Sequence, residues 1–303
     1  MMRTFKLVVL VALGLLLAPV TQTTQAAGPI QVDIYKGKIA TVNSYIFSNG
    51  ESQIVMDVQR ATSEAKKLTK VIKAKGLPLT HILITHGHPD HYTGMDWLLK
   101  EFPAAMVVVA NGSIKQDIIG FSTWMESIGW LDAEPSLKPK SDKNPNGFDY
   151  ENNITVLEGD TLEFVGGGVL TLQTHYEPSE SEHLTTVYVE DINGLFTADF
   201  VYNKVHLWMG SGVTDAYIDN WRAQLVKFED EYEDRKPTIY PGHGEPTDMS
   251  IFAELIQYID DFRRITTSVT SREEAMTKME KLYPDYGESS FLLKNSVDFH
   301  VSK

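Results

Sequence analysis

The sequence predicts an α/β fold, and three observations support this prediction. Short apolar runs separated by Gly and Asn turns open the chain after residue 30 and are typical of antiparallel strands. An amphipathic helix, a strand, a polar loop and a second helix then follow in that order. A second series of short strands starts near residue 154 and leads into helices. The second half of the chain is therefore expected to resemble the first half in kind.

The first half should begin with three strands joined by turns such as Asn49-Gly50. A helix is expected over Ala61–Lys75, because its apolar residues recur at helical spacing and Gly76 follows its last turn. The three predicted strands are Gln31–Tyr35, Ile39–Phe47 and Ile54–Asp57.

A second helix is expected after the polar loop, opened by a capping box at Thr93-Gly94-Met95-Asp96 and ended by Pro103. The positive end of its helix dipole would then lie near the loop. Met106–Ala110 is predicted to be a buried strand. The order from residue 81 is therefore strand, loop, helix, strand.

Residues 113–150 are predicted to form an irregular insertion whose second half is loop. Trp124 and Trp130 leave two interpretations open. Residues 119–130 either form a lid with apolar contacts to a substrate, or their aromatic side chains pack the insertion onto the core.

The second half is predicted to contain five strands, a helix, a last strand and two closing helices. Trp221, Leu225 and Phe228 recur at helical spacing, and Ser271 opens a capping box. The predicted strands are Ile154–Val156, Thr161–Val165, Val169–Gln173, Thr185–Val189, Leu195–Ala198 and Thr238–Tyr240, and the closing helices are Met249–Ile265 and the one after Ser271. No domain linker is evident, so residues 27–303 are expected to form one domain.

The first 26 residues are expected to be a secretory signal peptide, because Arg3 and Lys6 precede an apolar run that ends in small residues. A retained N-terminal anchor is the alternative. Cleavage near Ala26 predicts an exported protein, periplasmic or secreted, with no membrane span left in the mature chain.

The formal net charge is −14, from 27 Lys and Arg against 41 Asp and Glu. An acidic chain of this kind argues against nucleic acid as a partner, since its phosphates are bound by Lys and Arg. The sequence has no cysteine, so any metal must be held by His, Asp or Glu. No pattern predicts the oligomeric state.

The loop Thr85-His86-Gly87-His88-Pro89-Asp90-His91 predicts a metal site. Residues two apart on an extended backbone point the same way, so His86 and His88 can reach one ion. Pro89 then turns the chain, which lets Asp90 and His91 face a second position. Nitrogen and oxygen ligands suit zinc, and also iron or manganese.

These histidines, followed by Asp199 and by Pro241-Gly242-His243-Gly244, resemble the motifs of the metallo-β-lactamase-fold superfamily of hydrolases. The stretches Val42-Asn43-Ser44-Tyr45, Ile54-Val55-Met56-Asp57 and Leu195-Phe196-Thr197-Ala198-Asp199 are also similar to family strands, so the resemblance covers nearly all the mature chain. It implies a four-layer αβ/βα sandwich with two metal ions, expected to be Zn²⁺, at the edge of the sheets.

The resemblance implies that the first metal takes His86, His88 and a third histidine, but Glu180 stands in that place here. His183 or His175 are the alternatives to Glu180 if the loop is shifted. A glutamate at this position is similar to the alkylsulfatase-like branch, although that branch is larger. The second metal would take Asp90, His91 and His243, with Asp199 bridging the two ions.

Two such metals predict a hydrolase. Each lowers the pKa of a shared water toward about 7, so that a bridging hydroxide can attack an ester, lactone, amide, phosphate or sulfate ester of a small molecule, while Asp90 orients it. The aromatic insertion favours an apolar substrate. Lactam hydrolysis is not favoured, because the chain has no Cys ligand and Glu180 replaces a histidine of the first site. An iron-dependent redox enzyme and a non-catalytic, secreted metal-binding protein remain as alternatives.

Overall fold

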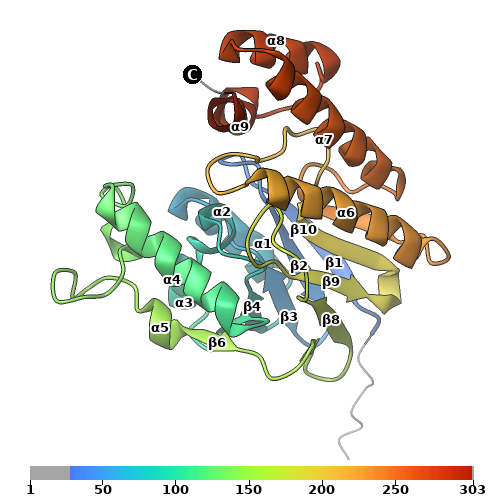
Figure 1. Ribbon diagram of the computed structural model, residues 1–303. Coiled ribbons are helices and arrows are strands. Elements are labelled where there is room, and N and C mark those ends of the chain that lie inside the picture. The colour runs from blue at the N-terminus through green and yellow to red at the C-terminus, as the bar shows by residue number, and fades with distance from the viewer. Residues whose placement is uncertain (1–27, 302–303) are drawn as a thin grey trace, which may run out of the picture.

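Two β-sheets stacked between helices form the protein, whose computed structural model describes residues 28–301 (Figure 1). The predicted signal peptide lies outside these described residues. The first sheet has the order β1-β2-β3-β4-β5-β6, antiparallel from β1 to β3 and parallel from β3 to β6. Its strands are β1 (Gln31–Lys36), β2 (Asn43–Ser48), β3 (Gln53–Met56), β4 (Leu79–Leu83), β5 (Met106–Val109) and β6 (Ile154–Val156).

The second sheet has the order β11-β10-β9-β8-β7, in which β10 and β11 are parallel and the other pairs are antiparallel. Every residue of β10 is buried, as expected for a strand covered on both faces. The strands are β7 (Thr161–Glu163), β8 (Val169–Gln173), β9 (Thr186–Val189), β10 (Gly194–Tyr202) and β11 (Thr238–His243).

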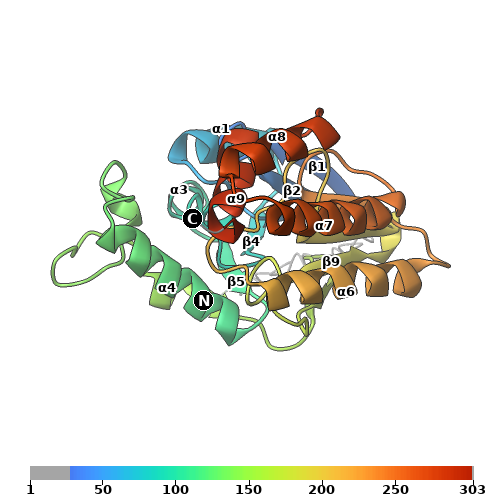
Figure 2. The same cartoon turned by 45° about the horizontal axis from the view of Figure 1, so that its top comes forward.

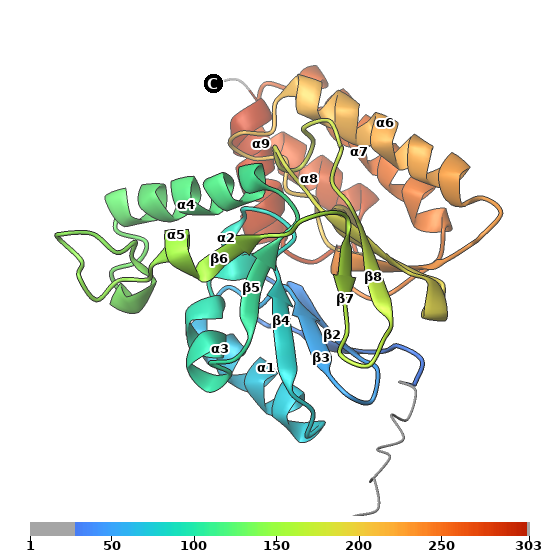
Figure 3. The same cartoon turned by 90° about the horizontal axis from the view of Figure 1, so that it is seen from below.

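Helices cover the outer face of each sheet, as Figures 2 and 3 show. Those on the first sheet are α1 (Thr62–Ala74), α3 (Met95–Glu101) and α4 (Gly112–Ser127). Those on the second are α6 (Asp215–Tyr232) and α7 (Ser250–Ser268), followed by α8 (Arg272–Leu282) and α9 (Lys294–His300). The shorter elements are α2 (Pro89–Tyr92), η1 (Pro135–Leu137), α5 (Tyr150–Asn153), η2 (Glu190–Ile192) and η3 (Ser289–Leu293).

Three apolar cores separate the four layers. The middle core lies between the sheets and contains Phe47, Leu83 and Phe196. The other two lie between each sheet and its own helices. This layer order is the predicted αβ/βα sandwich, and it leaves the ends of β4, β10 and β11 at one edge of the molecule. None of the helices within residues 28–301 has the length and apolar character needed to cross a membrane.

The prediction that the insertion is irregular does not hold for its first half, because the regular helix α4 occupies Gly112–Ser127. The side chain of Asn111 caps this helix by accepting a hydrogen bond from the Ile114 backbone N–H. Ile114, Ile118 and Met125 are buried against the first sheet. A capped start and a buried apolar face are what stabilise a helix here.

The predicted capping box at Thr93 does not form. The Thr93 hydroxyl instead donates to backbone carbonyls, including that of Pro89 at 2.8 Å, and α3 begins after Gly94. A Cβ at Gly94 would lie 1.9 Å from the Val58 carbonyl oxygen, so this turn requires glycine. The predicted strand from Ile39 also starts later, at Asn43, because Ala40 and Thr41 have positive φ.

Candidate metal centre

Seven His, Asp and Glu residues meet at the edge where β4, β10 and β11 end. His86 and His88 follow β4, and the short helix α2 carries Asp90 and His91. Glu180 lies in the loop between β8 and β9, Asp199 lies in β10, and His243 ends β11. Residues far apart in the chain are therefore brought together by the two sheets.

These side chains fall into two groups that each bring potential ligand atoms within 4.8 Å of one another. The first group is His86, His88, Glu180 and Asp199; the second is Asp90, His91 and His243. Asp199 also reaches the second group, because its Oδ1 lies 3.3 Å from His91 Nε2 and its Oδ2 lies 3.2 Å from His243 Nε2. Asp199 thus stands between two candidate metal positions.

The Asp199 position depends on the backbone around it. The pairing of β10 with β11 is irregular on both sides of Ala198, whose φ is 44°. A Cβ at Gly242 would lie 1.9 Å from Asp199 Oδ1, so only glycine leaves room for this carboxylate. The glycine of the Pro-Gly-His stretch therefore gives space to the carboxylate that lies between the two candidate metal positions.

Glu180 is the residue that the structure places beside His86 and His88. Its Oε1 lies 2.9 Å from His88 Nδ1, and its Oε2 lies 3.8 Å from His86 Nε2. The loop is held by a backbone bond from Thr185 N–H to the Thr85 carbonyl and by Asn220, whose side chain donates to the Pro178 carbonyl.

The two alternatives to Glu180 lie outside this group. His183 is directed to Asp117, with Nδ1 2.8 Å from Oδ2, and belongs to a separate cluster with Asp117 and Glu182. His175 is exposed and belongs to none of the three clusters found within the described residues.

Three histidines share one arrangement. Nδ1 of His91 donates to Asp57 at 2.8 Å, because an ionised carboxylate can only accept. Nδ1 of His86 faces the Thr85 hydroxyl at 3.0 Å, and Nδ1 of His243 faces the Thr41 hydroxyl at 3.2 Å. Each Nε2 is thereby left to face the centre, which is how metal-binding histidines are usually oriented.

Several buried atoms at the centre have no hydrogen-bond partner among the residues that the structure describes. They are His86 Nε2, His91 Nε2, Glu180 Oε2 and Asp199 Oδ1. Leaving such atoms unpaired in the interior costs free energy, so a group that satisfies several at once fits this place. Zn–N and Zn–O bonds of about 2.0 Å at tetrahedral angles put ligand atoms about 3.3 Å apart. Six of the distances between neighbouring donor atoms of different residues are 3.2–3.9 Å, which matches a metal better than direct hydrogen bonds. His88 Nδ1 and Glu180 Oε1, 2.9 Å apart, are instead at hydrogen-bond distance.

The buried charges shift the pKa values of the cluster in opposite directions. Burial lowers the pKa of His86 well below its usual value, and neighbouring His91 lowers it further. Burial also opposes charge on His91, but Asp199 and Asp57 raise its pKa well above the usual value. His91 and His243 hold the pKa of Asp199 well below the ordinary range despite its burial.

Sequence reasoning assigned no role to two residues that contact the proposed ligands. Asp57, the residue after β3, accepts from His91 and from Thr85, whereas the sequence predicts it only as the last residue of a strand. The Tyr202 hydroxyl donates to Asp199 Oδ2 at 2.6 Å and lies 3.3 Å from Glu180 Oε1, and its ring stacks on His243 at 4.7 Å. Tyr202 is three residues after Asp199, but no spacing rule in the sequence indicated this contact.

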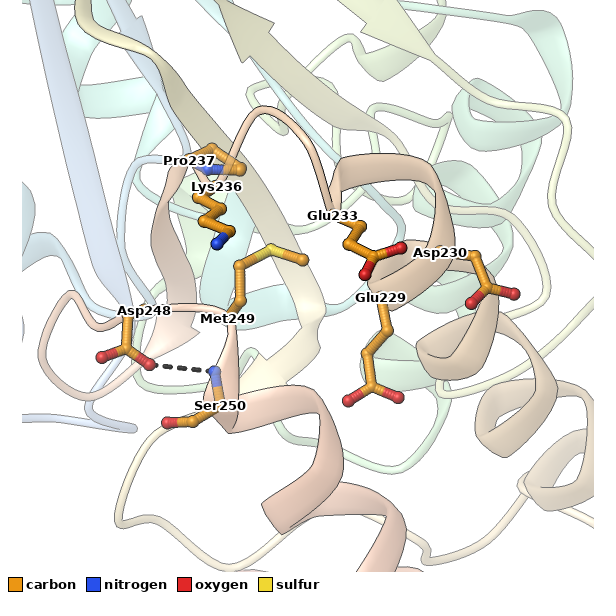
Figure 4. A pocket seen from close by; sticks show the side chains of 8 residues that line it. All are labelled: Glu229, Asp230, Glu233, Lys236, Pro237, Asp248, Met249 and Ser250. Carbon is orange, nitrogen blue, oxygen red and sulfur yellow. Dashed lines mark hydrogen bonds between the residues drawn. The ribbon is translucent and has the colours of Figure 1, made fainter.

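A surface cavity of about 510 Å³ lies away from these residues, between the C-terminal end of α6 and the N-terminal end of α7 (Figure 4). It contains none of the seven residues. In Figure 4 its carboxylates do not converge on one point. This cavity is lined by Glu229, Asp230, Glu233, Lys236, Pro237, Asp248, Met249 and Ser250.

Residues 39–243 match the family profile described as the metallo-beta-lactamase superfamily. A lactamase-like protein of Pestalotiopsis microspora is 24% identical over 210 residues, which are 67% of this chain and 49% of that protein. A probable metallo-hydrolase of Bacillus subtilis is 24% identical over 229 residues, covering 73% of this chain and 89% of its own. The chain spans from about half to under two thirds of the length of the first curated relatives it matches.

Solved structures show the same fold. A metallo-beta-lactamase from Pontibacter korlensis has a TM-score of 0.52 at 17% identity and covers 78% of this chain and 97% of its own. The DIM-1 metallo-beta-lactamase has a TM-score of 0.50 at 16% identity, with 78% of this chain and 95% of its own covered. These likenesses and the family profile confirm the resemblance drawn from the sequence and the predicted fold class.

Proposed function

Because the chain belongs to the metallo-beta-lactamase superfamily, we propose that it is a dinuclear zinc hydrolase acting on an ester, lactone, amide, phosphate ester or sulfate ester of a small molecule. His86, His88 and Glu180 would hold the first ion, and Asp90, His91 and His243 the second. Asp199 would bridge the two.

One observation carries this proposal. The two groups of donor atoms converge from three strand ends and one loop, and Asp199 lies beside both groups. Four buried atoms there have no hydrogen-bond partner within residues 28–301. A set of nitrogen and carboxylate donors of this kind suits Zn²⁺. When bound, zinc would lower the pKa of water toward about 7 and supply a nucleophile at neutral pH.

The chain's own residues would position the reacting water. The Asp90 side chain is 20% exposed, whereas that of Asp199 is only 2% exposed, so Asp90 is the carboxylate of the second position that solvent can reach. It lies 3.5 Å from His243 Nε2 and 3.7 Å from His91 Nε2. From this place Asp90 can accept a hydrogen bond from the attacking water and orient it.

The test is a hydrolysis panel of lactams, lactones, aryl esters, phosphate esters and alkyl sulfates on zinc-loaded protein. We expect turnover of at least one class, its loss on chelation, and its return with zinc or manganese. Asp199→Asn, which removes the shared carboxylate charge, should reduce both metal content and rate. A rate that chelation leaves unchanged would contradict the proposal. Full metal occupancy without turnover would instead support a metal-binding protein without catalysis.

An iron-dependent redox function is the second candidate, because three of the seven donors are carboxylates, namely Asp90, Glu180 and Asp199, and such a set also suits iron. Metal analysis of protein purified without added metal separates the two. Zinc in a colourless protein supports hydrolysis, whereas stoichiometric iron and visible colour would support redox chemistry.

We also propose that the protein is exported, with residues 1–26 removed as a signal peptide. Expression of the full chain followed by N-terminal sequencing of the periplasmic or secreted fraction tests this. A mature N-terminus at residue 27 is expected. An intact Met1 terminus in a membrane fraction would indicate a retained anchor.

A further inference from the structure

Large apolar side chains are exposed at the outer end of α4 and just beyond it. Trp124, Ile128 and Trp130 are 46%, 44% and 52% exposed. A group of exposed apolar residues on a chain with a net charge of −14 is unusual for a surface with no binding role. These exposed side chains therefore form a candidate binding surface.

The aromatic residues of this region form a continuous row that starts at a proposed metal ligand. The Phe121 ring lies 5.9 Å from the His88 ring, the Trp124 ring 5.2 Å from Phe121, and the Trp130 ring 5.1 Å from Trp124. We call Phe121, Trp124 and Trp130 the aromatic strip. It leads from the candidate metal centre to solvent along α4, the green helix at the left of Figure 1.

Local backbone structure holds the strip in place. Phe121 and Trp124 are three residues apart in α4, so they lie on the same side of the helix. Gly129, with a φ of 78°, ends the helix, and the Trp130 N–H then donates to the Met125 carbonyl at 2.9 Å. This turn brings Trp130 back against Trp124. Phe121 shares the buried side of α4 with Ile118 and Met125 and packs against the core, whereas Trp124 is exposed beside it.

The same helix is polar nearer the histidine loop. Asp117, one turn before Phe121, accepts from His183, and a Cβ at Gly87 would lie 2.6 Å from Asp117 Cβ. Thus α4 packs against the backbone between His86 and His88 with its polar part and extends outward with its aromatic part. A ligand lying along α4 would meet charged groups at one end and aromatic rings at the other.

We propose that the aromatic strip binds the apolar portion of the substrate, and that this portion carries an aromatic ring separated by several bonds from the group that is hydrolysed. The proposal rests on the hydrolase function proposed above. Tryptophan and phenylalanine favour edge-to-face and offset contacts with another ring, and such contacts add to the effect of burying apolar area. The substrate class is therefore an amphipathic aryl-alkyl ester or related derivative.

A membrane surface is the rival ligand for exposed tryptophans, but the nearby charges do not favour it. Lys138 is paired with Asp132 at 2.5 Å, and Lys140 with Asp149 at 3.1 Å. These lysines are thus neutralised by carboxylates rather than offered to anionic lipid headgroups. The direct contact of the strip with His88 also points to the metal centre rather than to a separate surface.

Two esters with the same leaving group test the proposal: p-nitrophenyl acetate and p-nitrophenyl 4-phenylbutyrate. We expect Trp124→Ala to raise KM for the phenylbutyrate ester roughly tenfold while its kcat stays nearly the same. Both kinetic constants for the acetate ester should also stay nearly the same. The reason is that a contact with a remote group stabilises the bound substrate and the transition state equally. Trp124→Phe should keep most of the affinity. Leu282→Ala, which removes a 49% exposed apolar side chain on α8, is the matched control and should leave KM and kcat for both esters unchanged.

Binding of 4-phenylbutyrate, measured by calorimetry, separates failure of this proposal from failure of the hydrolase function. Roughly tenfold weaker binding of 4-phenylbutyrate by Trp124→Ala than by Leu282→Ala would support the proposed role of the aromatic strip, even if neither ester is turned over. Equal binding and equal KM in the two variants would overturn the proposal. Sedimentation with phosphatidylcholine–phosphatidylglycerol vesicles tests the rival: loss of vesicle binding in Trp124→Ala with unchanged KM would also overturn it.

Discussion

At the scale of single residues, the position of Glu180 is the most informative feature of the proposed centre. A histidine at this place would be neutral, whereas Glu180 adds a third carboxylate beside Asp90 and Asp199. Burial raises the pKa of Glu180, and the adjacent His88 opposes that rise. Glu180 in turn raises the pKa of His88 to about 9 against the effect of burial. Within the first metal group, each of these two side chains therefore stabilises the charged form of the other.

We expect Glu180→His to shift the acid limb of the kcat/KM profile to lower pH by about one unit, because removing a negative charge makes a metal-activated water more acidic. The measurement is the pH profile together with metal content. His183→Gln is the control, since this residue bonds Asp117 instead. An unchanged profile and metal content in Glu180→His would argue that Glu180 is not a ligand.

Tyr202→Phe removes the hydroxyl that donates to Asp199 and lies near Glu180. We expect metal affinity to fall by roughly 10- to 100-fold, because hydrogen bonds from such supporting residues orient the ligands. Competition with a chelator of known affinity measures it. Tyr176→Phe is a matched control, since Tyr176 bonds Gln173 and Thr186 away from the centre. Equal affinity in both variants would count against this role.

At the scale of elements, the contact between the segment after β10 and helix α7 depends on a buried imidazole. Nδ1 of His206 lies 2.8 Å from the Tyr258 hydroxyl, and Nε2 has no partner among the described residues. Burial lowers the pKa of His206 to about 4. Protonation would therefore place an uncompensated charge between α7 and the segment that follows β10.

The unfolded chain binds a proton at His206 below about pH 6.5, whereas the folded chain does so only near pH 4. Stability from this residue is therefore fully present above pH 6.5 and lost as pH falls toward 4. We expect wild type to lose about 3 kcal/mol more than His206→Phe across this window, measured by urea unfolding. His175→Gln, at an exposed site, should keep the wild-type slope. Equal slopes in wild type and His206→Phe would show that His206 does not carry this dependence.

At the scale of the whole molecule, the proposed ligands join the two sheets. His86 and His88 follow β4 of the first sheet, whereas Asp199 and His243 belong to β10 and β11 of the second. Only the folded chain brings these residues together, so metal binding should stabilise the sheet-to-sheet arrangement. Chelation is therefore expected to affect stability as well as activity.

With zinc at about 1,000 times its dissociation constant, binding contributes about 4 kcal/mol to stability. For a chain of this size we expect removal of zinc by chelation to lower Tm by roughly 10 °C. Calorimetry with and without chelator measures this shift. Chelation should lower the Tm of Asp199→Asn by less than it lowers the Tm of the wild type. A Tm that chelation does not change in the wild type would contradict metal binding by the folded protein.

The local sequence was sufficient for the features that depend on neighbouring residues. It indicated the α/β class, most strands, and the histidine loop, because strand periodicity, turn residues and ligand spacing are short-range properties. The prediction of an irregular insertion overlooks the capped helix α4, although its signals, Asn111 and the apolar Ile114 and Ile118, are also short-range. The contacts of Asp57 and Tyr202 had no short-range signal that assigned them a role.

The third member of the first metal group was decided only by tertiary structure. His175, Glu180 and His183 lie within one loop, and their chemistry allows each of them to bind zinc. The choice depends on the loop path, which backbone bonds to Thr85 and the Asn220 contact determine. The sequence alone indicated the kinds of donor and six of the seven residues that the structure brings together at this edge. The fold decided which remaining side chain faces the centre, because side-chain direction in an irregular loop follows long-range contacts rather than spacing.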